Sequence, residues 1–157
     1  MRYLVDENLQ RVPDEEQFTL DSWIDLAPFE RLIGLVIERA EAGQAVLHLP
    51  FTVKLSQGGG VMHGGALTTL ADTAVAMAIK SLLPEGTRFA TTELSSRFLA
   101  PLLAGRVTAH ARISAPEGRT FSGEALLTDE DGRSIMTFSA IFKVAKGSPL
   151  PDLTLFF

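Results

Sequence analysis

The chain has 157 residues, of which 46% are hydrophobic, and this is enough apolar material for one domain with a buried core. Its formal net charge of −5 at pH 7, with no cluster of Lys or Arg, argues against a nucleic-acid partner. It contains no cysteine, which excludes disulfides, thiolate metal sites and a cysteine nucleophile.

The first 30 residues differ from the rest of the chain, because they contain eight acidic residues and only two basic ones, Arg2 and Arg11. They have no long apolar stretch, so we expect neither a signal peptide nor a membrane anchor. We predict a soluble protein, with the cytoplasm as its default location. Trp23, Phe29 and Leu32 are typical of short helical pieces that dock through apolar anchors. The sequence therefore predicts an acidic, partly helical N-terminal extension over residues 1–30.

Six segments have the patterns of β-strands. The clearest is 107–113, in which Val107, Ala109 and Ala111 alternate with polar residues at the two-residue period of a half-buried strand. The other five are 32–38, 45–49, 88–99, 121–127 and 136–144. Turn residues at 116–118 and 131–132 separate the last three strands, which predicts an antiparallel meander.

One helical pattern runs from Gly64 to about Leu83, between a glycine run at 58–60 and a Pro-Glu-Gly turn at 84–86. Strands precede and follow this helix, so the order predicts an α+β fold with one long helix packed on an antiparallel sheet of about six strands. We expect the main domain to cover residues 31–146, followed by a C-terminal tail over 147–157.

Asp72 is the only carboxylate on this helix. The helix face that carries Asp72 otherwise has short side chains, and Lys80 is the first long polar residue on the helix. This indicates that another part of the protein or a partner packs against that face. A carboxyl group in such surroundings tends to have a raised pKa, as a general base or a nucleophile requires. The alternative interpretation is an ordinary polar residue on a solvated stripe.

The helix is preceded by a glycine-rich loop, residues 58–65. Free N–H groups at a helix N-terminus stabilise negative oxygen, so the Gly64 N–H is a candidate donor to a thioester oxyanion. The alternative is an ordinary loop and helix start. The spacing of the glycines does not match a P-loop or a dinucleotide-binding fingerprint.

Residues 60–67, Gly-Val-Met-His-Gly-Gly-Ala-Leu, together with Asp72 nine residues after His63, resemble the hotdog-fold thioesterases of the phenylacetate-pathway (PaaI) type. The resemblance covers roughly residues 33–145. It implies a hotdog fold, in which the sheet wraps around the central helix, and an acyl-CoA thioesterase that needs no cofactor. Whether the acyl group is aromatic or medium-chain stays open.

The resemblance also implies roles for four residues. Asp72 matches the helix carboxylate that attacks the thioester carbonyl or activates water, and Gly64 matches the oxyanion donor. Gln57, six residues before His63, matches an amide that orients the carbonyl or the water. Thr91 matches a hydroxyl that assists from the next strand.

In this family two protomers join their sheets edge to edge with their helices facing. The resemblance therefore implies a homo-oligomer, either a dimer or a dimer of dimers, with shared active sites. Gln57 and Gly64 would come from one chain, and Asp72 and Thr91 from the other.

Four further residues are candidates for substrate binding. His63 and Gly65 belong to the glycine-rich loop, and we expect the His63 imidazole chiefly to bond the loop and fix the helix start. Arg97 and Arg119 are candidates for the CoA phosphates, because a guanidinium matches phosphate geometry; the alternative for each is a solvated surface arginine. The three histidines lack the spacing of a zinc site, so we predict no metal.

Two other functions share this fold. One is a non-catalytic acyl-CoA-binding protein, and the acidic N-terminal region argues against the DNA-binding segment that such a regulator usually carries. The other is a dehydratase or hydratase of acyl thioesters, but the arrangement of the His-Gly-Gly loop and Asp72 fits hydrolysis better.

Overall fold

A computed structural model describes residues 20–157 as a six-stranded sheet with one long and one short α-helix. In chain order the elements are α1 (Pro28–Ile33), β1 (Val36–Glu41), β2 (Gln44–Pro50), a 3-10 turn (Val53–Leu55), α2 (Gly64–Lys80), β3 (Phe89–Phe98), β4 (Arg106–Ile113), β5 (Thr120–Thr128) and β6 (Ser134–Val144).

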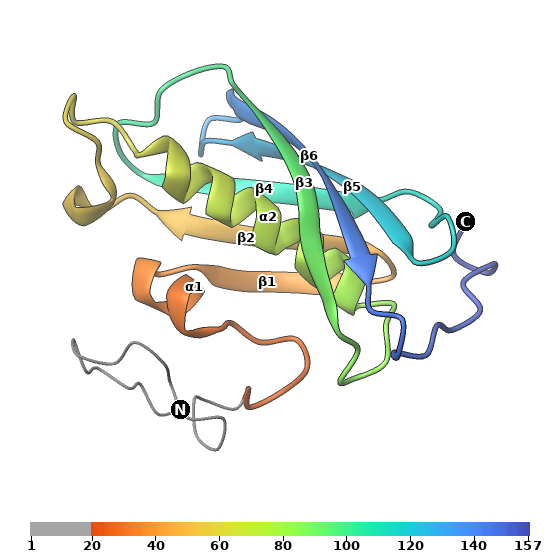
Figure 1. The fold of residues 1–157 in the computed structure, drawn as a ribbon. Coiled ribbons are helices and arrows are strands. Elements are labelled where there is room, and N and C mark those ends of the chain that lie inside the picture. Colours follow the sequence, from red (N-terminus) through yellow and green to blue (C-terminus); the bar gives the residue numbers. More distant parts are fainter. Residues whose placement is uncertain (1–19) are drawn as a thin grey trace.

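The strands form one antiparallel sheet in the order β1-β2-β4-β5-β6-β3. The sheet bends around α2, and β1 and β3 lie at its two edges (Figure 1). The predicted α+β fold, with one long helix held by a six-stranded antiparallel sheet, is therefore confirmed.

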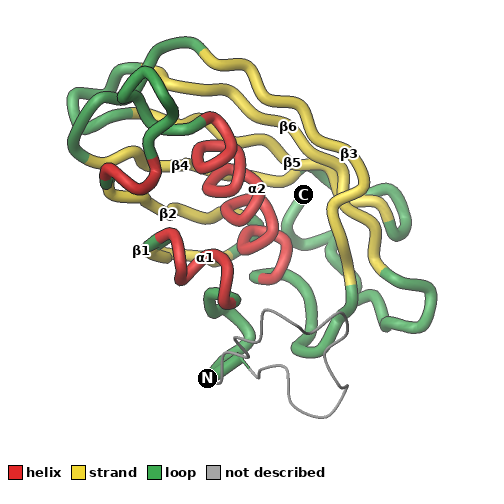
Figure 2. Tube along the Cα trace, turned by 60° about the vertical axis from the view of Figure 1, so that its left-hand side comes forward, coloured by secondary structure: helices red, strands yellow, loops and turns green. Residues whose placement is uncertain are grey.

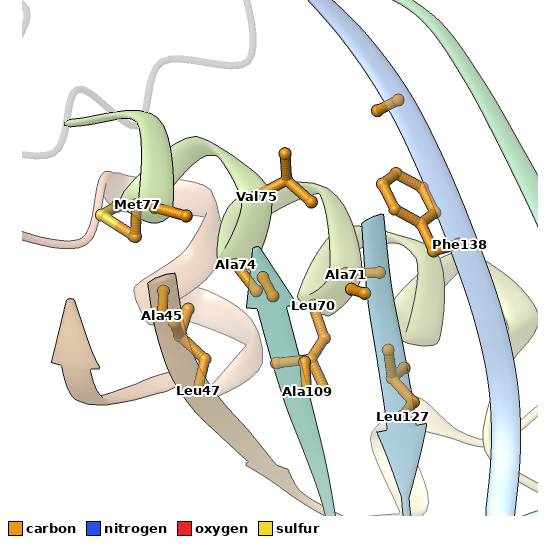
Figure 3. Close-up of a cluster of buried hydrophobic side chains, with 14 of the residues drawn as sticks. Ala45, Leu47, Leu70, Ala71, Ala74, Val75, Met77, Ala109, Leu127 and Phe138 are labelled. Atoms are coloured by element: carbon orange, nitrogen blue, oxygen red, sulfur yellow. The ribbon is translucent and has the colours of Figure 1, made fainter. Parts of the chain in front are cut away.

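The core lies between α2 and the sheet. Leu70, Ala71 and Ala74 of α2 are fully buried against strand residues such as Leu47 and Ala109 (Figure 3). The alanines let the helix lie close to the sheet, and burying each larger aliphatic side chain stabilises the fold by roughly 2 kcal/mol. In β4 the residues predicted to face inward are buried, as their two-residue period requires.

The first predicted strand was placed too early. Leu32 and Ile33 belong to α1, which begins with Pro28 in its first turn and ends at Gly34. Gly34 has a φ of 88°, a left-handed conformation that suits glycine at a helix C-terminus. Strand β1 therefore begins only at Val36. Helix α1 also runs across residue 30, the predicted end of the N-terminal extension.

Helix α2 ends at Lys80, three residues before the predicted end at Leu83. Here it meets the segment that precedes α1. The Trp23 indole N–H donates to the carbonyls of Lys80 at 2.9 Å and Leu83 at 3.1 Å, and the Lys80 amine donates to the Trp23 carbonyl at 3.0 Å. Residues 20–27 are thereby attached to the end of α2, and the predictions for residues 1–19 lie outside the described residues. Neither α-helix has the length and apolar character to span a bilayer, as far as residues 20–157 are concerned.

Candidate functional site

The loop before α2 is held in place by backbone hydrogen bonds. The His63 N–H donates to the Leu55 carbonyl at 2.7 Å, and the Met62 N–H donates to the Leu102 carbonyl at 2.8 Å. A tight turn is closed by a hydrogen bond from the Gln57 backbone N–H to the Val61 carbonyl at 2.8 Å. The first residues of α2 therefore have a defined position despite the glycines around them.

His63 caps the N-terminus of α2. Its Nδ1 accepts a hydrogen bond from the Gly65 N–H at 2.8 Å, so in the neutral ring the proton lies on Nε2. This bond uses the Gly65 N–H and leaves that of Gly64 for a ligand, because no acceptor for the Gly64 N–H lies within residues 20–157. His63 and Gly65 thus shape the site, and Gly64 presents the donor.

Gly64 and Gln57 line a common hollow of about 400 Å³, together with Met62, Leu67 and Phe98. A Cβ at position 64 would lie 3.0 Å from the Phe98 ring, so only glycine leaves the backbone accessible there. The Gln57 side-chain oxygen accepts a hydrogen bond from the Gly59 N–H, which leaves its NH₂ group as a donor. The structure therefore places two polar donors beside an apolar wall.

Asp72 and Thr91 form a second group. The Thr91 hydroxyl on β3 donates to both carboxylate oxygens of Asp72, at 3.0 and 3.2 Å. Asp72 is half-buried, and burial raises its pKa above the usual value. The bond from Thr91 acts in the opposite direction, and the negative charge of Glu30 adds to the increase. The result is a carboxylate that binds a proton more tightly than an exposed Asp does.

The two groups are too far apart within one chain to act on one carbonyl. Gly64 and Asp72 are eight residues apart in a single helix, which corresponds to about 12 Å along its axis. An oxyanion donor and an attacking group must both lie within about 3 Å of their reacting atoms. Within one chain, the Gly64 N–H and the Asp72 carboxylate therefore cannot act on the same carbonyl.

The two arginines lie apart from both groups. The Arg119 Nη1 donates to the carbonyls of Ala145 and Ser148, each at 2.7 Å, and so holds the C-terminal segment against the sheet. Arg97 is exposed on β3, and strand alternation directs its side chain to the face opposite that of Phe98. The structure brings neither guanidinium to Asp72 or to Gly64 of the same chain.

Glu30 was missed by the sequence reasoning. This α1 residue acts electrostatically on Asp72 and on Lys80, and its Oε2 is buried without a hydrogen-bond partner in the described part of the chain. No sequence signal distinguishes it from the other acidic residues before position 31, since only the docking of α1 places it there.

Comparisons with known proteins show which family the chain belongs to. Residues 59–136, which contain α2 and β3, match the thioesterase superfamily. The chain is 31% identical over 105 residues to the proofreading thioesterase EntH of Klebsiella pneumoniae, covering 67% of this chain and 77% of that protein. It is 36% identical over 102 residues to the 1,4-dihydroxy-2-naphthoyl-CoA hydrolase of Listeria monocytogenes, covering 64% and 82% respectively.

The fold is also similar to a solved structure, the phenylacetic acid degradation protein PaaI of Thermus thermophilus. The TM-score is 0.68 with 27% identity, and the match covers 74% of this chain and 98% of that one. Three findings lead to one assignment. They are the sheet wrapped around α2, the match of residues 59–136 to the thioesterase superfamily, and the relatives that are named as thioester hydrolases. This chain belongs to the thioesterase superfamily, as a hotdog-fold protein of the PaaI-like type, and it is a thioester hydrolase.

Proposed function

We propose that this protein hydrolyses an acyl-CoA to a free acid and CoA, without a cofactor, and that Asp72 is its reacting carboxylate. The observation that carries the proposal is the half-buried Asp72 carboxylate, bonded by Thr91 and with a raised pKa. Such a group is a stronger base than an exposed Asp at neutral pH. The Gly64 N–H and the Gln57 amide supply donors for the carbonyl.

Two chemical routes use the same residues. As a general base, Asp72 removes a proton from water, whose oxygen attacks the thioester carbon; as a nucleophile, Asp72 attacks directly and forms an anhydride that water then cleaves. In both, the carbonyl oxygen gains negative charge that the Gly64 N–H stabilises. The carbon–sulfur bond then breaks, and the CoA thiolate leaves and takes up a proton. Thr91 orients the carboxylate in either route.

The active site is formed by two protomers in this proposal, with Gln57 and Gly64 from one and Asp72 and Thr91 from the other. Strand β3 supports a site shared by two protomers. Within residues 20–157 this strand pairs only with β6, and its other edge is open. Its apolar side chains are also exposed in one chain, with Leu94 49% and Phe98 54% accessible. A twofold axis beside β3 reverses the second helix, so the start of one α2 approaches the middle of the other. A dimer, or a dimer of such dimers, satisfies this arrangement.

The acyl group is aromatic or medium-chain in this proposal. The hollow beside Gly64 is lined by Met62, Leu67 and Phe98, which favours an apolar acyl group over a polar one. The Listeria relative is named for an aromatic acyl-CoA, 1,4-dihydroxy-2-naphthoyl-CoA, which supports the aromatic class.

The test is the release of free CoA thiol from phenylacetyl-, benzoyl- and straight-chain acyl-CoAs. We expect turnover by the wild type and a decrease of at least ~100-fold for Asp72→Asn, because the variant lacks the basic or nucleophilic oxygen. Asp131→Asn, at an exposed turn, is the matched control and should keep full activity.

Other outcomes would identify the alternatives. Tight acyl-CoA binding without thiol release would indicate a non-catalytic binding protein. Addition of water to, or its loss from, the acyl chain with the thioester intact would indicate a hydratase or dehydratase. Full activity in Asp72→Asn would refute the role of Asp72.

A further inference from the structure

The end of β3 packs on the start of α2. The three heavy atoms nearest to a Cβ built on Gly64 are all ring atoms of Phe98, at 3.0, 3.1 and 3.8 Å. One turn further along the helix, the Thr68 and Ser96 hydroxyl oxygens are 3.1 Å apart. Figures 1 and 2 show the loop that precedes α2 and the loop that follows β3 at the same end of this helix. Phe98 therefore has a defined position beside the Gly64 backbone.

The Phe98 ring lies at the end of α2 to which the Gly64 N–H is directed. The Cα–Cβ bonds of a helix tilt toward its N-terminus, and the first N–H groups of the helix are free at that same end. The ring touches the position that a Cβ of residue 64 would take, so it flanks this N–H. In the proposed function the N–H donates to the thioester oxygen over about 3 Å. The acyl group on that carbonyl therefore begins within reach of the ring.

Phe98 also has accessible surface to offer to a ligand in the hollow beside Gly64. Met62 and Leu67 line the same hollow, but the side chain of each is buried and only 3% accessible. Leu99 is 49% accessible but aliphatic, whereas Phe98 is 54% accessible and is the aromatic residue of the lining. The far edge of its ring points at Gly64, which leaves the flat faces of the ring for other contacts.

We propose that Phe98 is a specificity-determining residue of the thioesterase site, whose ring stacks on the acyl group and favours flat aromatic groups over saturated ones of similar size. The inference rests on the proposed function, which places the thioester carbonyl at the Gly64 N–H. Two aromatic rings in offset or edge-to-face contact gain energy beyond the area that they bury, whereas a saturated ring gains only from the area. A straight chain in addition loses rotamer freedom when it is bound.

The experiment compares benzoyl-CoA with cyclohexanecarbonyl-CoA, whose acyl groups have the same carbon skeleton and differ in aromaticity. The ratio of their kcat/KM values is measured for the wild type, Phe98→Leu and Phe98→Met. We expect both substitutions to lower the benzoyl to cyclohexanecarbonyl ratio about 3- to 10-fold, which corresponds to one lost contact between rings. The concentration of active enzyme cancels in a ratio, so partial unfolding or dissociation of a variant does not produce this result.

Phe29→Leu is the matched control. Phe29 is similarly exposed, at 58%, but it lies on α1 and is not among the residues that line the hollow. Its substitution should leave the ratio at the wild-type value. An unchanged ratio in both Phe98 variants, or an equal change in Phe29→Leu, would overturn the proposal. If the ratio is unchanged and the Phe98 variants dissociate into monomers in sedimentation, the ring serves the contact between subunits instead.

Binding separates this proposal from the role of Asp72 in hydrolysis. Calorimetry on Asp72→Asn gives the Kd of both thioesters without the turnover that this variant should lack. Adding Phe98→Leu should weaken benzoyl-CoA more than cyclohexanecarbonyl-CoA, again by about 3- to 10-fold. A wild type that binds both thioesters and hydrolyses neither would contradict the proposed function alone. Equal weakening of both ligands would contradict the role of Phe98 alone.

Discussion

The protonation of Asp72 is set by opposing effects from its surroundings. Burial and the charge of Glu30 favour the neutral acid, whereas the hydrogen bond from Thr91 favours the carboxylate. The net effect raises the pKa, so the ionised form, which is the reacting form in the proposed function, is fully present only at a higher pH than for an ordinary Asp. Thr91 therefore keeps the group ionised as well as orienting it.

Removal of the Thr91 hydroxyl tests this balance. In Thr91→Val the pKa of Asp72 should rise further, because the bond that stabilises the carboxylate is lost. Because the ionised form is the reacting one in the proposed function, the acidic limb of kcat/KM should move to higher pH. The matched control is Thr92→Val, because Thr92 is exposed and, within residues 20–157, its hydroxyl donates to the Ile141 carbonyl and not to Asp72. A profile that moves equally in both variants, or in neither, would contradict this role of Thr91.

At the scale of elements, α2 is held at both ends by side chains outside the helix. His63 bonds the first turn, and the Trp23 indole bonds the carbonyls at the C-terminal end. Trp23 lies 57 positions before Lys80 and 60 positions before Leu83 in the sequence, so this second contact depends on the tertiary fold. It bonds carbonyls at the end of the helix and attaches residues 20–27 to it.

Trp23→Phe should loosen that attachment. The variant keeps an aromatic ring next to Lys80 but loses the N–H that two carbonyls share, and one lost hydrogen bond corresponds to about 1 kcal/mol of unfolding free energy. Urea unfolding measures the loss. Unchanged stability would show that the indole N–H has no net effect on the attachment.

The elements differ in how far local sequence predicts them. Strand β4 was predicted within one residue, because its alternation reflects its own two faces. Residues 32 and 33 were assigned to a strand, because the apolar residues of a short helix and of a strand look alike over so few positions. The helix start at Gly64 follows the local glycines, and its end at Lys80 follows Pro84, which has no N–H to donate to the Lys80 carbonyl.

At the scale of the whole molecule, the proposed site needs two chains. One protomer presents Gly64 and Gln57 at the start of α2, and Asp72 with Thr91 lies about 12 Å further along the helix. Within residues 20–157 one edge of β3 is unpaired, and in the proposed dimer a second copy brings the missing half to this edge.

Mixing two inactive variants tests the shared site. Asp72→Asn damages one half, and Gly64→Pro damages the other by removing the N–H donor at the first position of α2, where a helix tolerates proline. After joint unfolding and refolding, half of the dimers are mixed, and each has one undamaged site, so the mixture should recover roughly a quarter of wild-type activity. The control is mixing the folded proteins without subunit exchange. If the refolded mixture is no more active than the average of the two variants, each chain carries a complete site.

Local sequence determined the strands by their alternation, the long helix by its length and glycine-rich start, and Asp72 as the unusual carboxylate on it. These features depend on neighbours within a few residues, which the sequence displays directly. The resemblance to a family then pointed to Thr91. Only the tertiary structure showed the Thr91 bond to Asp72 and the Trp23 contact at the end of α2. These contacts join segments 19 to 60 residues apart, and folding rather than local pattern decides which distant groups meet.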